Sequence, residues 1–301
     1  MEEFAWFPPP DSGMRARFVE ANGLQFELVE AGAEGDRLAI CLHGFPELNL
    51  SWRHQIPLLA EQGWRVWAPN LRGYGASARP KGAAAYHIDT LTEDIGALID
   101  AAKAERPAFE VMLIAHDWGG AIAWDLAMRR VRPLDRLVVM NMPHPFTFAR
   151  SLRLSPAQRR RSWYVFFFQL PKLPEALMRA NGARAVRQAF RGMAANPERF
   201  PSDILDIYAA AALRPGAMTA MINYYRAIRM ARGRVAASDP RVDVPTLLVW
   251  GTADEALGLE TLDGIHAYLP DLTLKFLPGI SHWVQQDAPE EVNAILRDWL
   301  T

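Results

Sequence analysis

Three residues with acid–base chemistry each follow an apolar, strand-like run of this 301-residue chain. Asp117 comes after V-M-L-I-A-H, Asp254 after L-L-V-W-G-T-A, and His282 after the run that ends at Leu277. Parallel α/β sheets bring the carboxyl ends of their strands to one edge, where ligands bind. We therefore expect the three side chains to meet there. A nucleophile, an acid and a histidine in this chain order are typical of a catalytic triad on an α/β sheet.

The segment around Asp117 has the layout of a nucleophile elbow, a sharp turn from a strand into a helix. Ala115 and Gly119 are small residues two positions before and after Asp117, where a larger side chain would clash within the turn. Aspartate stands here where such enzymes usually carry serine. In an alternative interpretation, Asp117 only caps the helix that follows, a position that aspartate favours. The elbow alone does not decide between the two.

An alternation of strand-like and helical segments must position these side chains. Residues 15–20 and 24–30, separated by A-N-G, predict a hairpin. Apolar runs predict buried strands at 38–42, 64–68, 111–114, 136–140, 245–250 and 272–277. A capping box at Thr90 and Glu93 and a cap at Asp287 predict the starts of two of the intervening helices. The expected fold is α/β, with a mostly parallel eight-stranded sheet flanked by helices.

The alternation stops near residue 144 and resumes near residue 245. Only helical and aromatic stretches such as S-W-Y-V-F-F-F-Q lie between these points. We expect residues 1–144 and 241–301 to form a core domain, with residues 145–240 as a helical insertion. The basic run at 159–161 is interpreted as a solvated helix face.

The composition restricts the functions that the chain can have. Half of the residues are apolar, enough for a sizeable core, and the formal net charge is −1. This charge gives no electrostatic case for binding nucleic acid or an anionic membrane. The single cysteine, Cys41, sits in an apolar run and excludes an internal disulfide. The N-terminal residues lack the regions of a signal peptide, and no apolar run is long enough to span a bilayer. We expect a cytoplasmic protein that uses no metal or other cofactor; the sequence leaves a homodimer open.

Six motifs, spread over almost the whole chain, carry a resemblance to a known family. They are H-G-F-P-E at 43–47, S-W-R-H-Q-I-P at 51–57, L-R-G-Y-G-A-S at 71–77, H-D-W-G-G at 116–120, W-G-T-A-D at 250–254 and S-H-W-V-Q-Q-D-A-P-E-E-V-N at 281–293. With these motifs the chain resembles the α/β-hydrolase-fold enzymes of the soluble epoxide hydrolase family. The resemblance implies that residues 145–240 form a lid over the active site and that the Phe45–Pro46 bond is cis.

The resemblance also implies two lid tyrosines that donate to the epoxide oxygen. Tyr164 matches the first of them in W-Y-V-F-F-F-Q-L-P, and Tyr225 matches the second in N-Y-Y-R, where Tyr224 is a close competitor. The backbone N–H groups of Phe45 and Trp118 would form an oxyanion hole. The side chains expected to line an apolar substrate pocket are those of Phe45, Trp118, Trp163, Phe167, Met221 and Trp283.

These residue types suit the hydrolysis of an apolar or aromatic epoxide to a vicinal diol. Asp117 is ionised at neutral pH and would open the ring to leave an ester, which water can cleave, whereas a serine would leave an ether. A phenol can donate a proton to the epoxide oxygen as its charge develops. His282, oriented by Asp254, would activate the water that attacks the ester. The expected partners are therefore an apolar epoxide and water.

Other proteins with this fold remain as alternatives. Haloalkane dehalogenases share the aspartate nucleophile and the D-W-G elbow, and hold the released halide with N–H donors that Trp118 and Trp163 would supply here. Phe45 argues against this alternative because Asn or Glu is common at that position, and the two tyrosines follow the epoxide pattern. A fluoroacetate dehalogenase would carry arginine at position 118. A subgroup with its triad acid after the preceding strand is disfavoured, since Asn141 and Met142 offer no carboxylate. A non-catalytic protein that senses small molecules would not need the triad.

Overall fold

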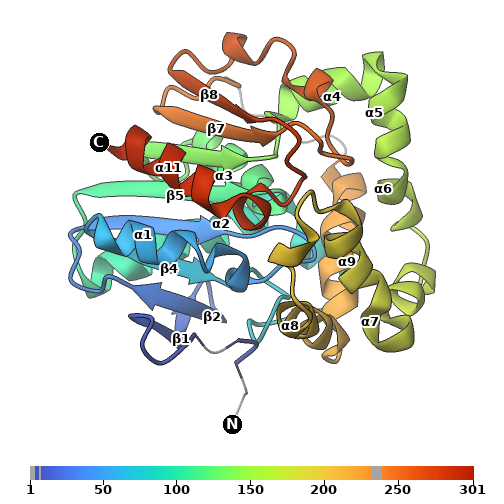
Figure 1. Ribbon diagram of the computed structural model, residues 1–301, viewed down its shortest axis with the longest axis horizontal. Coiled ribbons are helices and arrows are strands. Elements are labelled where there is room, and N and C mark those ends of the chain that lie inside the picture. Colours follow the sequence, from blue (N-terminus) through green and yellow to red (C-terminus); the bar gives the residue numbers. More distant parts are fainter. Residues whose placement is uncertain (1–3, 7, 232–238) are drawn as a thin grey trace.

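An eight-stranded, mostly parallel sheet forms the centre of the protein (Figure 1). The computed structural model describes residues 4–6, 8–231 and 239–301. The strands lie side by side in the order β1-β2-β4-β3-β5-β6-β7-β8. Strands β3 to β8 run parallel to one another, whereas β2 is antiparallel to both β1 and β4. The predicted fold class is therefore confirmed.

The first two strands, β1 (Met14–Ala21) and β2 (Leu24–Ala31), form the predicted hairpin. Asn22 and Gly23 occupy its two-residue turn with φ of 48° and 68°. A type I′ turn requires this left-handed backbone at both positions, and asparagine followed by glycine is the pair that adopts it most readily. The hairpin therefore extends the sheet at one edge, beside β4.

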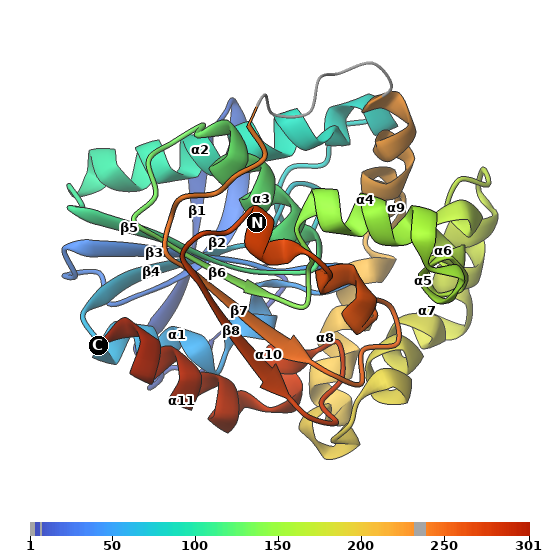
Figure 2. The same ribbon diagram turned by 90° about the horizontal axis from the view of Figure 1, so that it is seen from above.

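The parallel strands are short apolar runs that helices cover on both faces. Their bounds are Arg37–Leu42 for β3, Trp64–Pro69 for β4, Glu110–His116 for β5, Arg136–Met140 for β6, Thr246–Gly251 for β7 and Leu272–Leu277 for β8. Helices α2 (Ile88–Glu105) and α3 (Trp118–Arg129) lie on one face, and α1 (Gln55–Glu61) and α11 (Pro289–Leu300) lie on the other (Figure 2). Cover on both faces explains why every residue of β4 and β7 is buried. Cys41 in β3 is fully buried, as expected.

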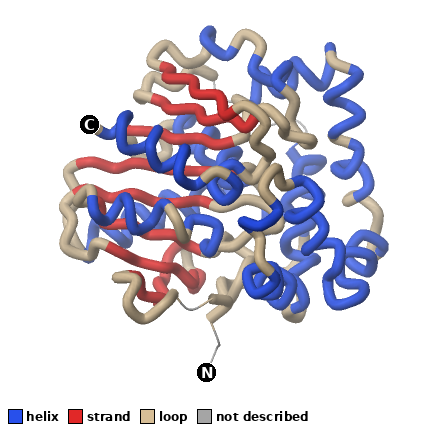
Figure 3. The backbone as a smooth tube through the Cα atoms, viewed as in Figure 1, coloured by secondary structure: helices blue, strands red, loops and turns tan. Residues whose placement is uncertain are grey.

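The stretch between β6 and β7 is helical, and the part that the structure describes contains no strand. Its helices are α4 (Pro145–Leu154), α5 (Pro156–Arg161), α6 (Trp163–Phe167), α7 (Leu173–Met193), α8 (Ser202–Leu213) and α9 (Ala217–Ala227). The arrows of the parallel strands point toward this insertion in Figure 1, and Figure 3 shows the same region as helices and loops beyond the carboxyl ends of these strands. Residues 232–238 of the expected insertion lie outside the described residues.

Two predicted helix caps are wrong. Helix α2 starts before Thr90, and His87 caps it by accepting a 3.4 Å bond from the N–H of Asp89. The carboxylate of Asp287 does not cap α11 but accepts bonds of 2.9 and 2.7 Å from the N–H groups of Ala195 and Asn196. Asp287 thus ties the insertion to the core.

No helix in the described part of the chain is long and apolar enough to cross a membrane.

Candidate active site

Asp117 lies at the tip of the sharp turn between β5 and α3. Its backbone has φ 47° and ψ −121°, a conformation that residues other than glycine adopt rarely and at a cost in energy. A Cβ at Gly119 would come within 2.2 Å of the carbonyl oxygen of Leu42, so the turn needs glycine there. The Asp117 side chain makes no capping bond to α3, and its Oδ1 instead accepts a 2.7 Å bond from the Phe45 N–H. The capping interpretation is therefore wrong.

The three acid–base residues meet at the carboxyl edge of the sheet. Asp254 follows β7, and His282 follows β8. The Nδ1 of His282 lies 2.7 Å from Oδ2 of Asp254, and its Nε2 lies 3.8 Å from Oδ2 of Asp117. Asp254 is itself held by the side-chain amide of Asn141 at 2.7 Å and by two backbone N–H groups just after it, at 2.7 and 2.9 Å. The histidine therefore has a fixed orientation between the two carboxylates.

Neighbouring charges set the proton affinity of the triad, because solvent barely reaches it. His282 and Asp254 are 4% and 5% exposed. Burial lowers the pKa of His282, but the charges of Asp254 and Asp117 outweigh this effect and raise it to about 9. Burial likewise raises the pKa of Asp254, whereas His282 and Asn141 together hold it below its ordinary value. His282 therefore carries a second proton at neutral pH as long as both carboxylates are charged.

Tyr164 and Tyr225 come from the helical insertion and lie within electrostatic range of Asp117. Tyr164 lies in α6 and Tyr225 in α9, and their rings meet edge to face with centroids 5.9 Å apart. Burial, followed by the charge of Asp117, raises the pKa of both phenols above the ordinary range, so both keep their protons at neutral pH. Tyr224 points elsewhere, since its hydroxyl donates a 2.8 Å bond to the carbonyl of Arg72. Of the two adjacent tyrosines in α9, Tyr225 is the one whose pKa is raised by burial and also by the charge of Asp117.

The loop after β3 brings backbone N–H groups to Asp117. A Cβ at Gly44 would lie 2.4 Å from the Cβ of Asp117 and 2.5 Å from its Oδ1. Glycine therefore permits the close approach that places the Phe45 N–H on that oxygen. Trp118 is the first residue of α3, and N–H groups in the first turn of a helix have no acceptor within the helix. The Phe45–Pro46 peptide bond is cis, as expected.

A fully buried pair, Glu47 with His116, lies beneath the triad and does not stand out in the sequence. Oε2 of Glu47 is 2.7 Å from Nδ1 of His116 and accepts a 2.8 Å bond from the Gly44 N–H. Nε2 of His116 is 2.9 Å from the carbonyl oxygen of His282. Burial raises the pKa of Glu47, but His116 holds it below its ordinary value. The pair therefore joins the Phe45 loop to the His282 loop. In the sequence, Glu47 closes the H-G-F-P-E motif in the loop after β3, and His116 ends β5 and opens the H-D-W-G-G motif.

Phe45 and Trp118 line the space around Tyr225. Both are partly exposed, and their rings meet the Tyr225 ring edge to face at centroid distances of 5.3 and 5.2 Å. The structure therefore places these two side chains beside the residues that face Asp117.

The other four residues expected to line the pocket differ in how far they are buried. Met221 is fully buried and Phe167 is partly buried. Trp283 packs behind the His282 ring, with centroids 4.9 Å apart. Trp163 is 63% exposed, which is not the position expected of a residue that lines a pocket or binds a halide. Its ring is tilted against that of Phe167 in the same helix, with centroids 5.9 Å apart.

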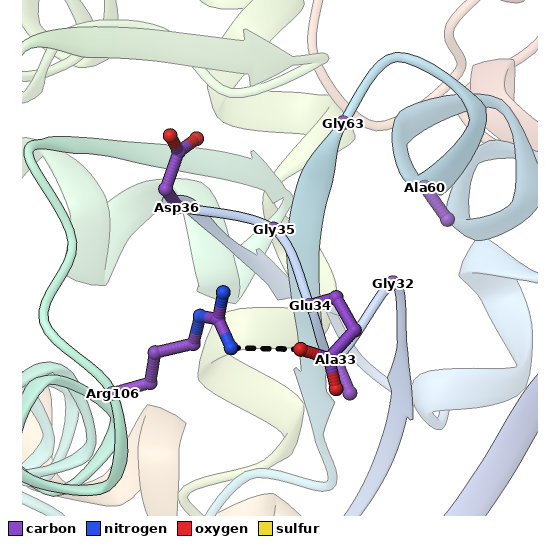
Figure 4. A pocket seen from close by; sticks show the side chains of 8 residues that line it. All are labelled: Gly32, Ala33, Glu34, Gly35, Asp36, Ala60, Gly63 and Arg106. Atoms are coloured by element: carbon purple, nitrogen blue, oxygen red, sulfur yellow. Dashed lines mark hydrogen bonds and ion pairs between the residues drawn. The ribbon is translucent and has the colours of Figure 1, made fainter.

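A surface hollow of about 520 Å³ lies away from these residues, at the amino ends of β3 and β4 (Figure 4). Arg106 and Glu34 form a 2.8 Å ion pair across it, but they are 43% and 93% exposed. The hollow therefore lacks the buried, mutually oriented acid–base groups found around Asp117. Within the described residues, no group of three or more His, Cys, Asp or Glu side chains is arranged to hold a metal ion.

Comparison with known proteins agrees with this geometry. The alpha/beta hydrolase fold family matches residues 40–289. The chain is 38% identical to the AB hydrolase superfamily protein YfhM of Bacillus subtilis (strain 168), over 96% of this chain and 98% of that protein. It is 35% identical to Epoxide hydrolase 1 of Caenorhabditis elegans, over 96% of this chain and 70% of that protein. A crystal structure of an epoxide hydrolase from Bacillus megaterium with an inhibitor superposes with a TM-score of 0.84 and 29% identity, covering 94% of this chain and 99% of that one.

Proposed function

Because the chain belongs to the epoxide hydrolase family of α/β-hydrolase-fold proteins, we propose that it hydrolyses an apolar or aromatic epoxide to a vicinal diol. The observation that carries this proposal is the placement of Tyr164 and Tyr225: their rings meet at a centroid distance of 5.9 Å, Tyr225 packs on Phe45 and Trp118 beside Asp117, and burial and the charge of Asp117 raise the pKa of both phenols. A carboxylate can attack a ring carbon while a phenol protonates the ring oxygen. Together, these two events open the epoxide ring without leaving a free alkoxide.

In the first step, the two oxygens of Asp117 have different tasks. Oδ1 is held by the Phe45 N–H at 2.7 Å, so Oδ2 is the oxygen that attacks. A bond forms between Oδ2 and a ring carbon, the carbon–oxygen bond of the ring breaks, and a tyrosine proton moves to the released oxygen. The product is an alkyl ester on Asp117. Two phenols that converge on the oxygen stabilise its charge without reorganisation.

In the second step, His282 acts as the base. Esterification removes the negative charge that lies 3.8 Å from Nε2, and this loss lowers the pKa of His282. The ring can then give up its extra proton and take one from water, which attacks the ester carbonyl carbon. The Phe45 N–H, with that of Trp118, stabilises the oxygen of the tetrahedral intermediate; one such donor contributes about 3 kcal/mol. On collapse, the bond between the ester carbon and the alkyl oxygen breaks, and that oxygen takes the proton that His282 removed from water, which completes the diol. The new carboxyl group returns its proton to His282, and the extra proton that His282 gave up earlier restores the tyrosine.

Residues 145–240 act in this proposal as a lid domain on the core of residues 1–144 and 241–301. The insertion lies beyond the strand ends that carry the triad (Figure 1), and it supplies both tyrosines. An apolar epoxide would enter between lid and core, against Phe45 and Trp118. The exposed position of Trp163 supports epoxide hydrolysis over halide release, which needs a second N–H donor at the site.

Single-turnover chemistry tests the mechanism. Excess enzyme is mixed with a styrene-type epoxide in ¹⁸O-water, and the diol and the Asp117 peptide are analysed by mass spectrometry. We expect the label in Asp117 and none in the first diol, because water attacks the carboxyl carbon. Label in the first diol would exclude the ester. Release of halide from a haloalkane panel, with no diol from epoxides, would overturn the proposed function.

Two variants separate the steps. Asp117→Ala should abolish diol formation, whereas His282→Gln should consume about one epoxide per enzyme and accumulate the ester, visible as a mass increase of the intact protein. Asp243→Ala, at an exposed carboxylate paired with Arg130 on the surface, is the matched control and should keep full turnover.

A further inference from the structure

The helical insertion carries much of the positive charge of the protein. Residues 145–231 contain 14 lysine and arginine residues against 4 aspartate and glutamate residues, whereas the whole chain has 33 and 34. The net charge of −1 is therefore an average over a basic insertion and an acidic remainder. An electrostatic expectation drawn from the net charge does not apply to the insertion by itself.

The outer side of the insertion also exposes large apolar side chains. Trp163 and Phe166 in α6, Leu170 in the connection, and Leu173 and Leu177 in α7 are 63%, 74%, 45%, 48% and 52% exposed. We call these five residues the outer patch. They fall within a short stretch of the chain, and α6 and α7 run along the outer edge of the insertion, away from the sheet, in both views (Figures 1 and 2). Large apolar side chains exposed along one segment are typical of an interaction surface.

Basic side chains flank the outer patch along the chain. Arg160 precedes it, Lys172 lies within it and Arg179 follows it, and all three are exposed. None of the three forms an ion pair with a residue that the structure describes. Their charge is therefore available to a partner rather than neutralised within the fold.

We propose that the outer patch and its basic flanks dock the protein onto the surface of an anionic lipid bilayer. Tryptophan, phenylalanine and leucine side chains enter the boundary between headgroups and acyl chains, while lysine and arginine remain with the lipid phosphates. This is peripheral binding, without a membrane-spanning segment. This proposal departs from the expectation of no membrane partner. It goes beyond epoxide hydrolysis and does not depend on that activity.

A second copy of the chain fits the surface less well. A two-fold symmetric contact would bring the same patch of both copies together. The basic flanks would then face each other, and like charges across an interface oppose association. An anionic bilayer satisfies both the apolar and the charged part of the surface.

Vesicle flotation tests the proposal without any substrate. The full-length protein is mixed with vesicles of phosphatidylcholine and phosphatidylglycerol, or of phosphatidylcholine alone. We expect binding to the anionic vesicles and release as salt rises from about 0.1 M to about 1 M, because the screening length falls from about 10 Å to about 3 Å. Phe166→Ser/Leu173→Ser should weaken binding about tenfold or more, and Lys172→Glu about fivefold or more.

Matched controls lie on the opposite side of the protein. Phe109 is 71% exposed just before β5, and Lys103 is exposed in α2, so Phe109→Ser and Lys103→Glu should bind as the parent does. The proposal is overturned if the parent protein does not bind anionic vesicles, or if the patch variant Phe166→Ser/Leu173→Ser binds them as tightly as Phe109→Ser does. It is also overturned if sedimentation shows a dimer that the patch variant dissociates while vesicle binding is unchanged. Diol formation, measured on the same variants, reports separately on the proposed function.

Discussion

The charge on Asp117 should control the proton on His282, and the structure allows the size of this effect to be calculated. Nε2 of His282 and Oδ2 of Asp117 are 3.8 Å apart. At an effective dielectric constant of about 20, two unit charges at this separation interact by about 4 kcal/mol, and in bulk water by about 1 kcal/mol. One pKa unit corresponds to about 1.4 kcal/mol. Removing the charge should therefore lower the pKa of His282 by about 1 to 3 units.

Asp117→Asn makes this change with little loss of shape and imitates the neutral ester. Starting from a pKa of about 9, His282 in the variant should titrate between about pH 6 and pH 8. The measurement is an NMR titration of the imidazole resonances, with the His282 signal assigned by its absence in His282→Gln. Intact mass confirms that the amide survives.

A control variant in the same titration can refute this prediction. Asp243→Asn removes an exposed carboxylate on the protein surface and should leave the His282 signal unchanged. If Asp117→Asn shifts the signal by no more than this control does, the charge of Asp117 does not hold the proton on His282. Esterification would then not prepare the base for the second step, and the proposed sequence of events would need another source for it.

Three further predictions follow from the geometry. Gly44→Ala should lower kcat about a hundredfold or more, by displacing Asp117 from its N–H donor, with circular dichroism unchanged; activity within threefold of the parent would contradict the close contact. Tyr164→Phe and Tyr225→Phe should each slow ester formation at least about tenfold in stopped-flow traces, whereas Tyr224→Phe should not, so an equal effect of all three would contradict their assignment. His282 has a folded-state pKa raised from 6.5 to about 9, so its contribution of about 3 kcal/mol to the free energy of unfolding is complete below pH 6.5 and lost as pH rises through 9. Urea unfolding at several pH values should show this loss in the parent and not in His282→Gln.

The strands could be predicted because their signal is local. Each is a short apolar run bounded by polar residues or glycine, and cover on both faces removes the alternation that would otherwise be expected. The helix cap predicted at Thr90 failed because α2 begins earlier, with a local cap at His87. The cap predicted at Asp287 failed because the partners of that side chain are not local. Asp287 has the spacing of a cap, but its carboxylate is bound by the N–H groups of Ala195 and Asn196, about ninety residues away in the sequence. No local pattern reports such a contact.

Some residues of the candidate site could likewise be predicted from local sequence, and others could not. Chain order and motif spacing locate Asp117, Asp254 and His282, because each must follow a strand of a parallel sheet. The directions of the side chains in the insertion depend on packing instead. Trp163 is therefore exposed, although the next residue of α6, Tyr164, lies within electrostatic range of Asp117. The pairing of Glu47 with His116, across 69 residues, is likewise visible only in three dimensions.

The closeness of Gly44 to Asp117 explains how one carboxylate can serve both steps of the proposed reaction. The Phe45 N–H holds Oδ1, and the Gly44 backbone lies so near that a single added Cβ would fall 2.5 Å from that oxygen. The hydrogen bond from the Phe45 N–H therefore defines which of the two oxygens lies on the donor side. Oδ1 stays with the N–H donors and becomes the carbonyl oxygen of the ester, while Oδ2 stays on the His282 side and becomes its alkyl oxygen. Water activated by His282 then attacks a carbonyl whose oxygen is already hydrogen-bonded, without any rearrangement between the two steps.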